Sequence, residues 1–365
     1  MARLLWLVFT FCGAQMAFGS SQANNKCFSR TTTAPFANTA VVTDPGALLR
    51  VIQDMLPYFK HNYAVVESSL LAHHGISRDA AYKTLMFIEQ VIEQDRGKAH
   101  QRITDSRFLS HHFNFLKWHG DKGGYEKAGA RVSWKGDGLD GNNIRLTSYA
   151  VFMSDGGDCK SDKYPVALYG LVEETPALKK FMKTQSRDDL FGDGFNTQEI
   201  APCVRPLVWV NSKAASDALM EGTIIIKMPD GNLRYFNVHK PYTIASNDPN
   251  PVRDIRYWFF KEVNDINGND GGPHLKKLNH SKVLFAGDTK QLGLGKIIAL
   301  DYTNPRTQKK EVRLGVLGDT GDAFRNNLYQ LDIFAGIYEN RKDFWNDLRS
   351  QPSAAQAYFL VKKNH

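Results

Sequence analysis

Residues 313–336, RLGVLGDTGDAFRNNLYQLDIFAG, constrain the fold of this chain more than any other stretch. Apolar residues alternate with polar or small ones at 312–316, which predicts a half-buried strand. Residues 318–322 are too rich in Gly and Asp to continue a sheet, so a turn is expected there. A second apolar run, residues 331–334, carries a single acid, Asp332. The chain should therefore pass through a tight connection into a segment that holds one carboxyl among bulky side chains.

Asp332 is the first candidate for a chemical role. Burial among apolar neighbours disfavours the charged carboxylate and should raise the pKa of this group. A carboxyl that keeps its proton near neutral pH can donate it to a leaving group. An acid that faces solvent from an edge strand has the same spacing, so the pattern alone leaves both interpretations open.

The same stretch resembles a known family signature. DTGDAF at 319–324, followed by LDIFAG at 331–336, is similar to the pattern of the 3D (three-aspartate) family, roughly D-x-G-G-A-I and then D-x-(Y/F)-x-G. The best-known members are lytic transglycosylases of the MltA type. The first aspartate of that family usually ends an upstream strand, and the resemblance assigns it to Asp301 in KIIALDY.

Further blocks of the family pattern occur in the same order upstream. They are IRLTSYAVF (144–152), YPVALY (164–169), PLVWVNS (206–212) with MPDG (228–231), and HKPYTIA (239–245). Each block is a weak match alone, but their collinear order is specific. The resemblance extends over about two thirds of the chain, from about residue 140 to the end.

The resemblance implies a mainly β protein with N-terminal helices, of the α+β class. A double-psi β-barrel domain would comprise residues 44–144 and 246–365, with a smaller β-rich domain, residues 145–245, inserted into it. A groove between the two domains would hold a glycan strand.

The sequence patterns predict the N-terminal helices independently of this resemblance. Asp44 can cap a first helix and Pro45 suits its first turn, and apolar residues follow at helical spacing. A second amphipathic helix is expected to begin near Ser77.

Strand patterns begin at about residue 144. Residues 222–238 predict a hairpin, because the Pro-Asp-Gly at 229–231 suits a tight turn. Residues 253–263 are expected to form a short helix, followed by a polar loop at 264–273. Its Asp and Asn spacing is similar to a calcium loop, but Asp270 stands where such a loop needs Gly and Lys276 where it needs Glu.

The N-terminus predicts a secretory signal peptide at residues 1–19, with a basic start, a short apolar run and small residues at a cleavage site. Residues 20–43, rich in Ser, Thr, Asn and Ala, are expected to be a flexible leader. The apolar run is too short for a stable membrane anchor. We therefore expect a periplasmic or secreted protein, monomeric after cleavage.

Three cysteines follow the predicted signal peptide. In an oxidising compartment Cys159 and Cys203 could form a disulfide, which would leave Cys27 free. No spacing of Cys or His predicts a zinc site, and neither a metal nor a cofactor is expected.

A formal net charge of +8 favours anionic partners. The basic residues are scattered and match no DNA- or RNA-binding motif, so nucleic acid is not the expected partner. For a secreted chain the simplest anionic partner is a cell-wall polymer, whose peptides carry carboxylates.

The resemblance implies cleavage of the bond between N-acetylmuramic acid and N-acetylglucosamine in peptidoglycan, with a 1,6-anhydro ring left on the muramic acid. The 6-hydroxyl of the sugar attacks, so one carboxyl can act first as acid and then as base. By motif position Asp332 has this role, and Asp319 would lie nearby and help to keep its pKa high. Asp301 is the third family aspartate, and a capping or turn role remains open for it.

Candidate substrate-binding residues come from the other matching blocks. Tyr149 and Tyr242 could stack on sugars or hydrogen-bond them, and Thr147 offers a hydroxyl. Packing or turn formation remains the alternative for these three. Asp322 replaces the second Gly of the signature and adds charge near the site, and Glu221 lies where the family has a groove-lining segment.

Two other functions remain open. The chain could be a catalytically silent peptidoglycan-binding protein of the same fold. It could also be a hydrolytic glycosidase that uses Glu221 as its acid across the groove from Asp332.

Overall fold

The structure, a computed structural model, describes residues 26–31, 35–61, 66–128, 141–192, 194–245, 256–266 and 281–364. The predicted signal peptide lies outside these residues, and so does most of the calcium-like loop. The helices are α2 (Pro45–His61), α4 (Ser69–Ala72), α5 (Arg78–Gln94), α6 (Ser106–His112), α7 (Lys122–Ala128), α8 (Pro176–Met182), α9 (Arg187–Phe191), α10 (Ser212–Glu221), α11 (Thr289–Leu292) and α12 (Arg341–Leu348).

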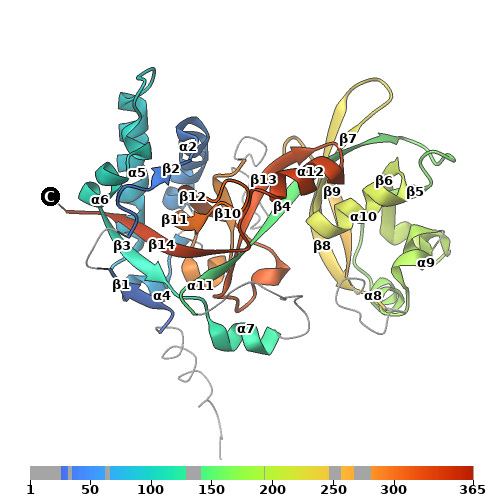
Figure 1. The fold of residues 1–365 in the computed structure, drawn as a ribbon. Coiled ribbons are helices and arrows are strands. Elements are labelled where there is room, and N and C mark those ends of the chain that lie inside the picture. Colours follow the sequence, from blue (N-terminus) through green and yellow to red (C-terminus); the bar gives the residue numbers. More distant parts are fainter. Residues whose placement is uncertain are drawn as a thin grey trace, which may run out of the picture.

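The strands are β1 (Phe28–Arg30), β2 (Ala40–Val41), β3 (Phe113–Trp118), β4 (Ile144–Gly157), β5 (Val166–Leu171), β6 (Val204–Val210), β7 (Thr223–Lys227), β8 (Leu233–Thr243), β9 (Arg256–Val263), β10 (Leu284–Ala286), β11 (Lys296–Thr303), β12 (Lys310–Asp319), β13 (Gln330–Tyr338) and β14 (Ala354–Lys362). The fold is thus a mixed α/β structure with one large sheet, as expected for the predicted class (Figure 1).

Strand pairings close a circuit of β4 with five strands from the C-terminal part of the chain. The order is β14–β11–β12–β10–β13–β4, and β4 pairs back to β14 through Ala354 with Arg145 and Ala355 with Ile144. All six strands contribute to one apolar cluster, which contains, among others, Phe285, Ile298, Leu317, Ile333, Leu146 and Phe359. The first strand of the circuit in sequence therefore pairs directly with the last.

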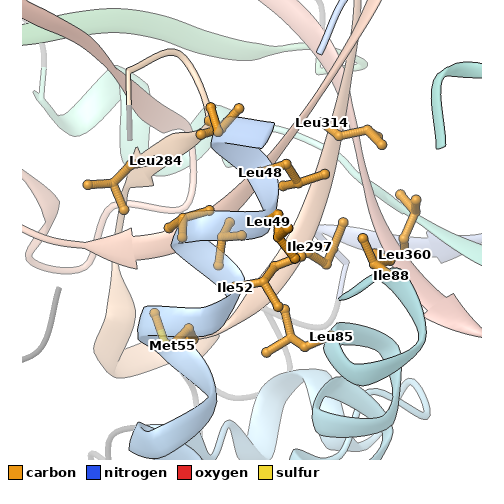
Figure 2. Close-up of a cluster of buried hydrophobic side chains, with 14 of the residues drawn as sticks. Leu48, Leu49, Ile52, Met55, Leu85, Ile88, Leu284, Ile297, Leu314 and Leu360 are labelled. Carbon is orange, nitrogen blue, oxygen red and sulfur yellow. The ribbon is translucent and has the colours of Figure 1, made fainter. Parts of the chain in front are cut away.

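The two predicted N-terminal helices cover one side of this circuit. The carboxylate of Asp44 accepts hydrogen bonds from the first amides of α2, and the hydroxyl of Ser77 caps α5. Apolar residues of both helices pack against strands of the circuit (Figure 2). The labelled residues are Leu48, Leu49, Ile52 and Met55 of α2 and Leu85 and Ile88 of α5, with Leu284, Ile297, Leu314 and Leu360 of the strands.

A second apolar core lies at the other end of the molecule. It is built from β5–β9 and α8–α10, on the side of the circuit away from α2 and α5 (Figure 1). β4 joins the two cores, because its early residues pair with β13 and its later residues pair with β6 and β7. The predicted hairpin is confirmed as β7 and β8, with Gly231 at φ 86° in the turn.

Two expectations from the sequence differ from the structure. Residues 256–263 form strand β9 and not part of a helix, with Val238 of β8 paired to Phe260. Aromatic side chains favour a pleated surface, and neighbouring β8 supplies the hydrogen-bonding partner. Within the predicted leader, β1 pairs with β3 and β2 pairs with β12, so residues 28–30 and 40–41 are ordered as strands.

Cys27, Cys159 and Cys203 are all free thiols, so the bridge that the sequence permitted is not formed. Cys159 is exposed and Cys203 is buried in the second core, where its sulfur lies 3.4 Å from the hydroxyl of Thr175. Within the described residues, no group of three or more His, Cys, Asp or Glu side chains is arranged to hold a metal ion. A helix of the length and apolarity that a membrane crossing requires is also absent from these residues.

Candidate active site

Four residues lie in one row across four neighbouring strands. Ala286 of β10 pairs with Asp319 of β12 on one side and with Asp332 of β13 on the other, and Asp332 pairs with Thr147 of β4. We refer to Asp319, Ala286, Asp332 and Thr147 as the acid row. Two strand spacings, about 10 Å, separate the Cα atoms of the two aspartates. The small side chain of Ala286 lies between them.

Strand alternation places the acid row on one face of the sheet. Leu331 and Ile333, the immediate neighbours of Asp332, point into the core of the circuit. Because successive side chains alternate, Asp332 points to the opposite face. On β12 a register irregularity skips Gly318, so that Leu317 pairs with Phe285 in the core while Asp319 pairs with Ala286. Such a bulge re-aims the side chain that follows it.

Asp332 is partly buried and belongs to a polar network with β4. Its Oδ1 accepts a hydrogen bond of 3.1 Å from Nε2 of Gln330, which also donates to the hydroxyl of Thr147 at 2.9 Å. Nη1 of Arg145 donates to Oε1 of Gln330 at 3.3 Å. Burial raises the pKa of Asp332 to about 6; Gln330 and Arg145 oppose this rise and Asp319 adds to it.

Asp319 is completely buried and is held by two donors. The hydroxyl of Tyr149 donates to its Oδ2 at 2.8 Å, and the amide of Thr320 donates to its Oδ1 at 2.9 Å. Tyr149 packs against Phe334 at a ring separation of 5.3 Å. Burial raises the pKa of Tyr149 well above its usual value, with further contributions from Asp319, Asp332 and Glu221. The phenol therefore remains a neutral hydrogen-bond donor between carboxylates.

Glu221 reaches this group from the second core. It is the last residue of α10, and its Oε2 accepts a hydrogen bond of 3.3 Å from the amide of Ala150, next to Tyr149. The helix ends there because Gly222 adopts a left-handed conformation, φ 72°, which glycine tolerates best.

Asp301 lies apart from Asp319 and Asp332, the other two aspartates that the sequence resemblance names. It pairs with Val312 on β12, seven residues before Asp319, which corresponds to about 23 Å along a strand. Burial raises the pKa of Asp301, and the nearby charge of Lys310 opposes the rise. The sheet register therefore brings together Asp319 and Asp332 but not Asp301.

Tyr242 also lies away from the acid row. Its hydroxyl donates to Oε1 of Glu174, and its ring packs edge-on against Phe259 in the second core. The side chain of Asp322 lies outside the described residues, although its backbone begins a short 3-10 helix, Asp322–Phe324.

The structure brings together five of the residues predicted from the sequence: Asp332, Asp319, Thr147, Tyr149 and Glu221. Arg145 and Gln330, which belong to the same network, were not predicted. The sequence did contain a signal for Arg145 and Gln330. Gln330 precedes Asp332 by two residues and Arg145 precedes Thr147 by two, so each shares a strand face with a candidate. That the two strands are parallel neighbours was not visible in the sequence.

Three comparisons with known proteins bear on this geometry. No protein-family model matches the chain, and no curated protein matches its sequence. The fold is similar to solved structures of lytic transglycosylases. Escherichia coli MltA with bound chitohexaose has 14% sequence identity and a TM-score of 0.60, over 92% of this chain and 95% of that one.

Two further structures agree. MltA from Neisseria gonorrhoeae has 12% identity and a TM-score of 0.55, covering 88% of this chain and 89% of that one. A membrane-bound lytic murein transglycosylase from Agrobacterium tumefaciens has 13% identity and a TM-score of 0.54, covering 88% and 93%. At such low identity these likenesses establish a shared fold over nearly the whole chain.

Proposed function

We propose that this chain, which has the fold of the MltA structures, is a peptidoglycan lytic transglycosylase with Asp332 as its single acid and base. The observation that carries the proposal is the acid row. It holds a partly buried carboxyl with a pKa of about 6 beside a second, fully buried aspartate. A carboxyl with a pKa near the working pH can both give up and take back a proton.

The proposed reaction needs no water. Protonated Asp332 donates its proton to the glycosidic oxygen between N-acetylmuramic acid and N-acetylglucosamine, and the bond from that oxygen to the anomeric carbon breaks. The 6-hydroxyl oxygen of the muramic acid then bonds to the same carbon and its proton passes to the Asp332 carboxylate. The enzyme returns to its starting state, and the 1,6-anhydro ring is the product. Attack within one sugar gains its rate from positioning.

Asp319 would stabilise the positive charge that develops on the sugar ring. It accepts hydrogen bonds from the hydroxyl of Tyr149 and the amide of Thr320, which suit a carboxylate. Tyr149 and Thr147 would then lie at the edge of the sugar site. Asp301 has no part in this proposal, because the register of β11 separates it from the acid row.

The proposal also includes the domain division. Residues 44–144 and 246–365 would form the catalytic domain and residues 145–245 the inserted domain. The strand circuit would be the double-psi β-barrel, and the first half of β4 would contribute to it from the range of the inserted domain. Separate apolar cores support a division into two domains, and β9 belongs with the second core. The glycan strand would lie in a groove between the domains. Because peptidoglycan lies outside the cytoplasm, we place the protein there, without a membrane anchor and as a monomer.

Digestion of purified sacculi tests the proposed function. We expect soluble muropeptides whose mass is lower by one water than that of the hydrolytic products, and we expect them to disappear in Asp332→Asn. Products with a reducing end would instead indicate a hydrolase. Loss of activity in Glu221→Gln, with activity kept in Asp332→Asn, would move the acid to Glu221. Binding to sacculi without any soluble product would indicate a silent binding protein.

A further inference from the structure

The side chain of Gln330 connects the two strands of the candidate site. It is 7% exposed, lies at the start of β13, and pairs in register with Arg145 of β4. Both of its polar ends are in use: Oε1 accepts from Arg145, and Nε2 donates to Thr147 and Asp332. A buried carboxamide with three polar partners has one preferred orientation.

Arg145 determines that orientation. A guanidinium group has only donors, so it must face the oxygen of the Gln330 carboxamide. The NH₂ end is then directed toward Thr147 and Asp332, whose oxygens can both accept. If the amide were flipped, its oxygen would face the carboxylate of Asp332 and its NH₂ would face Arg145, two unfavourable contacts at once.

The contact with Gln330 distinguishes the two oxygens of Asp332. Oδ1 accepts the amide hydrogen, and no hydrogen bond is made to Oδ2 within the part of the chain that the structure describes. A protonated carboxyl in this setting carries its hydrogen on the oxygen that is not already accepting one. In the reaction proposed above, Oδ2 would therefore be the atom that exchanges the proton.

We infer that Gln330 is a positioning residue: its amide, oriented by Arg145, holds Oδ1 of Asp332 and assigns proton transfer to Oδ2. The inference rests on the proposed transglycosylase function. In each cycle the proton leaves Oδ2 for the glycosidic oxygen, and the proton of the 6-hydroxyl returns to Oδ2. Gln330 itself keeps its protons throughout.

Gln330 also influences the charge state of Asp332. A donor to Oδ1 favours the carboxylate and opposes the effect of burial. The other charged or titratable groups around Asp332 are Arg145 and Tyr149 on β4 and Asp319 on β12, and Glu221 at the end of α10 acts on Tyr149. None of these residues is replaced in a Gln330 variant; Arg145 alone loses a contact there, its hydrogen bond to Oε1 of Gln330.

The test is the pH dependence of sacculus digestion by the full chain. Because protonated Asp332 is the active form, the rate falls as pH rises through its pKa. Gln330→Met keeps the size of the side chain but removes the donor. The alkaline limb of the profile is the pH range over which kcat/KM falls as pH rises. We expect this limb to lie about one pH unit higher in the variant, the equivalent of one lost hydrogen bond to a charged group. We also expect kcat to fall about tenfold, because the carboxyl is no longer held.

If Gln330 only connects β13 to β4 and does not act on Asp332, the result is different. The rate of Gln330→Met would fall, but the position of the alkaline limb would not move, and that outcome overturns the inference. Gln330→Glu is the second variant. Its carboxylate cannot donate a hydrogen bond and adds a negative charge beside Asp332. The alkaline limb should therefore lie at a still higher pH than in Gln330→Met. If the alkaline limb of Gln330→Glu lies at the same pH as that of the wild type, this result also contradicts the inference.

A direct titration separates failure of this inference from failure of the proposed function. The pKa of Asp332 can be followed by carbon-13 NMR of labelled aspartate carboxyls, with Asp332→Asn to assign the signal. If the wild type yields no soluble product, the proposed function fails, but a higher pKa in Gln330→Met still supports the contact. An unchanged pKa contradicts the contact whatever the activity.

Discussion

At the scale of single residues, the carboxyl of Asp332 makes folding less favourable once it loses its proton. Its pKa is about 6 in the folded chain against an ordinary value of 3.8, so between these limits the folded state holds more protons than the unfolded state. Stability therefore falls as pH rises from about 4 to about 6 and stays lower above that. The same burial that suits Asp332 to acid chemistry thus lowers the stability of the protein.

Asp332→Asn should consequently stabilise the fold while abolishing the proposed activity. Near pH 8 we expect a gain of about 1–3 kcal/mol, the upper limit corresponding to about two pKa units. Near pH 4 only a small part of the gain should remain, because the wild-type carboxyl is then protonated in the folded state and close to half protonated in the unfolded state. Urea unfolding of both proteins at the two pH values measures the difference. A gain that is the same at both pH values would show that proton linkage is not its cause.

The residues of the site differ in how far the sequence could reveal them. Asp332 and Asp319 were predicted as candidates because a motif marks them and because an acid within an apolar run is unusual. The motif also named Asp301, but a motif records order along the chain and carries no strand register. Gln330 belongs to no motif, and Arg145 was not singled out within the block at 144–152. Their contact depends on two strands more than 180 residues apart in sequence.

At the scale of elements, the position of β10 determines the spacing of the acid row. β10 has only three residues and lies between β12 and β13. Phe285 of this strand is fully buried, and its ring packs directly over Gly315 of β12. A Cβ atom at residue 315 would lie 2.3–2.6 Å from three atoms of that ring, which is closer than contact allows.

Gly315→Ala should therefore displace β10 and with it Ala286, the residue between the two aspartates. We expect a loss of stability of about 1–3 kcal/mol from overpacking, together with lower activity. The matched control is Gly321→Ala in the signature turn, where the nearest atom to a new Cβ is 3.9 Å away. The control should change stability by less than about 0.5 kcal/mol. Thermal unfolding and sacculus digestion measure both variants, and equal stability of the two would contradict the packing argument.

The elements themselves were predictable where a single local pattern dominates. α2 and α5 have capping residues and an apolar stripe, and the β7–β8 hairpin has its turn residues. β9 was mistaken for a helix because a run of aromatic residues fits either period over so short a length. Its strand form depends on β8, with which it pairs over its whole length. The pairing of β4 with β14 that closes the circuit is equally non-local.

At the scale of the whole molecule, β4 is the structural link between the site and the second core. Its first half carries Arg145, Thr147 and Tyr149, and its second half pairs with β6 and β7. Glu221 approaches the same strand from α10. A glycan bound along the second core would therefore contact elements that are rigidly connected to the acid row, which is what alignment of a scissile bond requires.

The net charge of +8 gives the last prediction. Peptidoglycan presents carboxylates on its peptides, so electrostatic attraction should contribute to binding of the whole protein. The distance over which such attraction acts falls from about 10 Å at 0.1 M salt to about 3 Å at 1 M. The Asp332→Asn variant should bind sacculi without cleaving them. We therefore expect the amount of this variant retained on sacculi to fall at least tenfold between 0.1 M and 1 M salt. Co-sedimentation at increasing sodium chloride measures it.

Sacculi whose peptide carboxylates have been converted to amides are the control. They keep the glycan strands but lose most of the negative charge, so binding should be weaker at 0.1 M salt and should then depend little on salt. The binding that remains measures the uncharged contacts of the site, among which we propose those of Tyr149 and Thr147. If salt has no effect on native sacculi, the scattered basic residues serve solubility and the glycan contacts alone hold the protein on the wall.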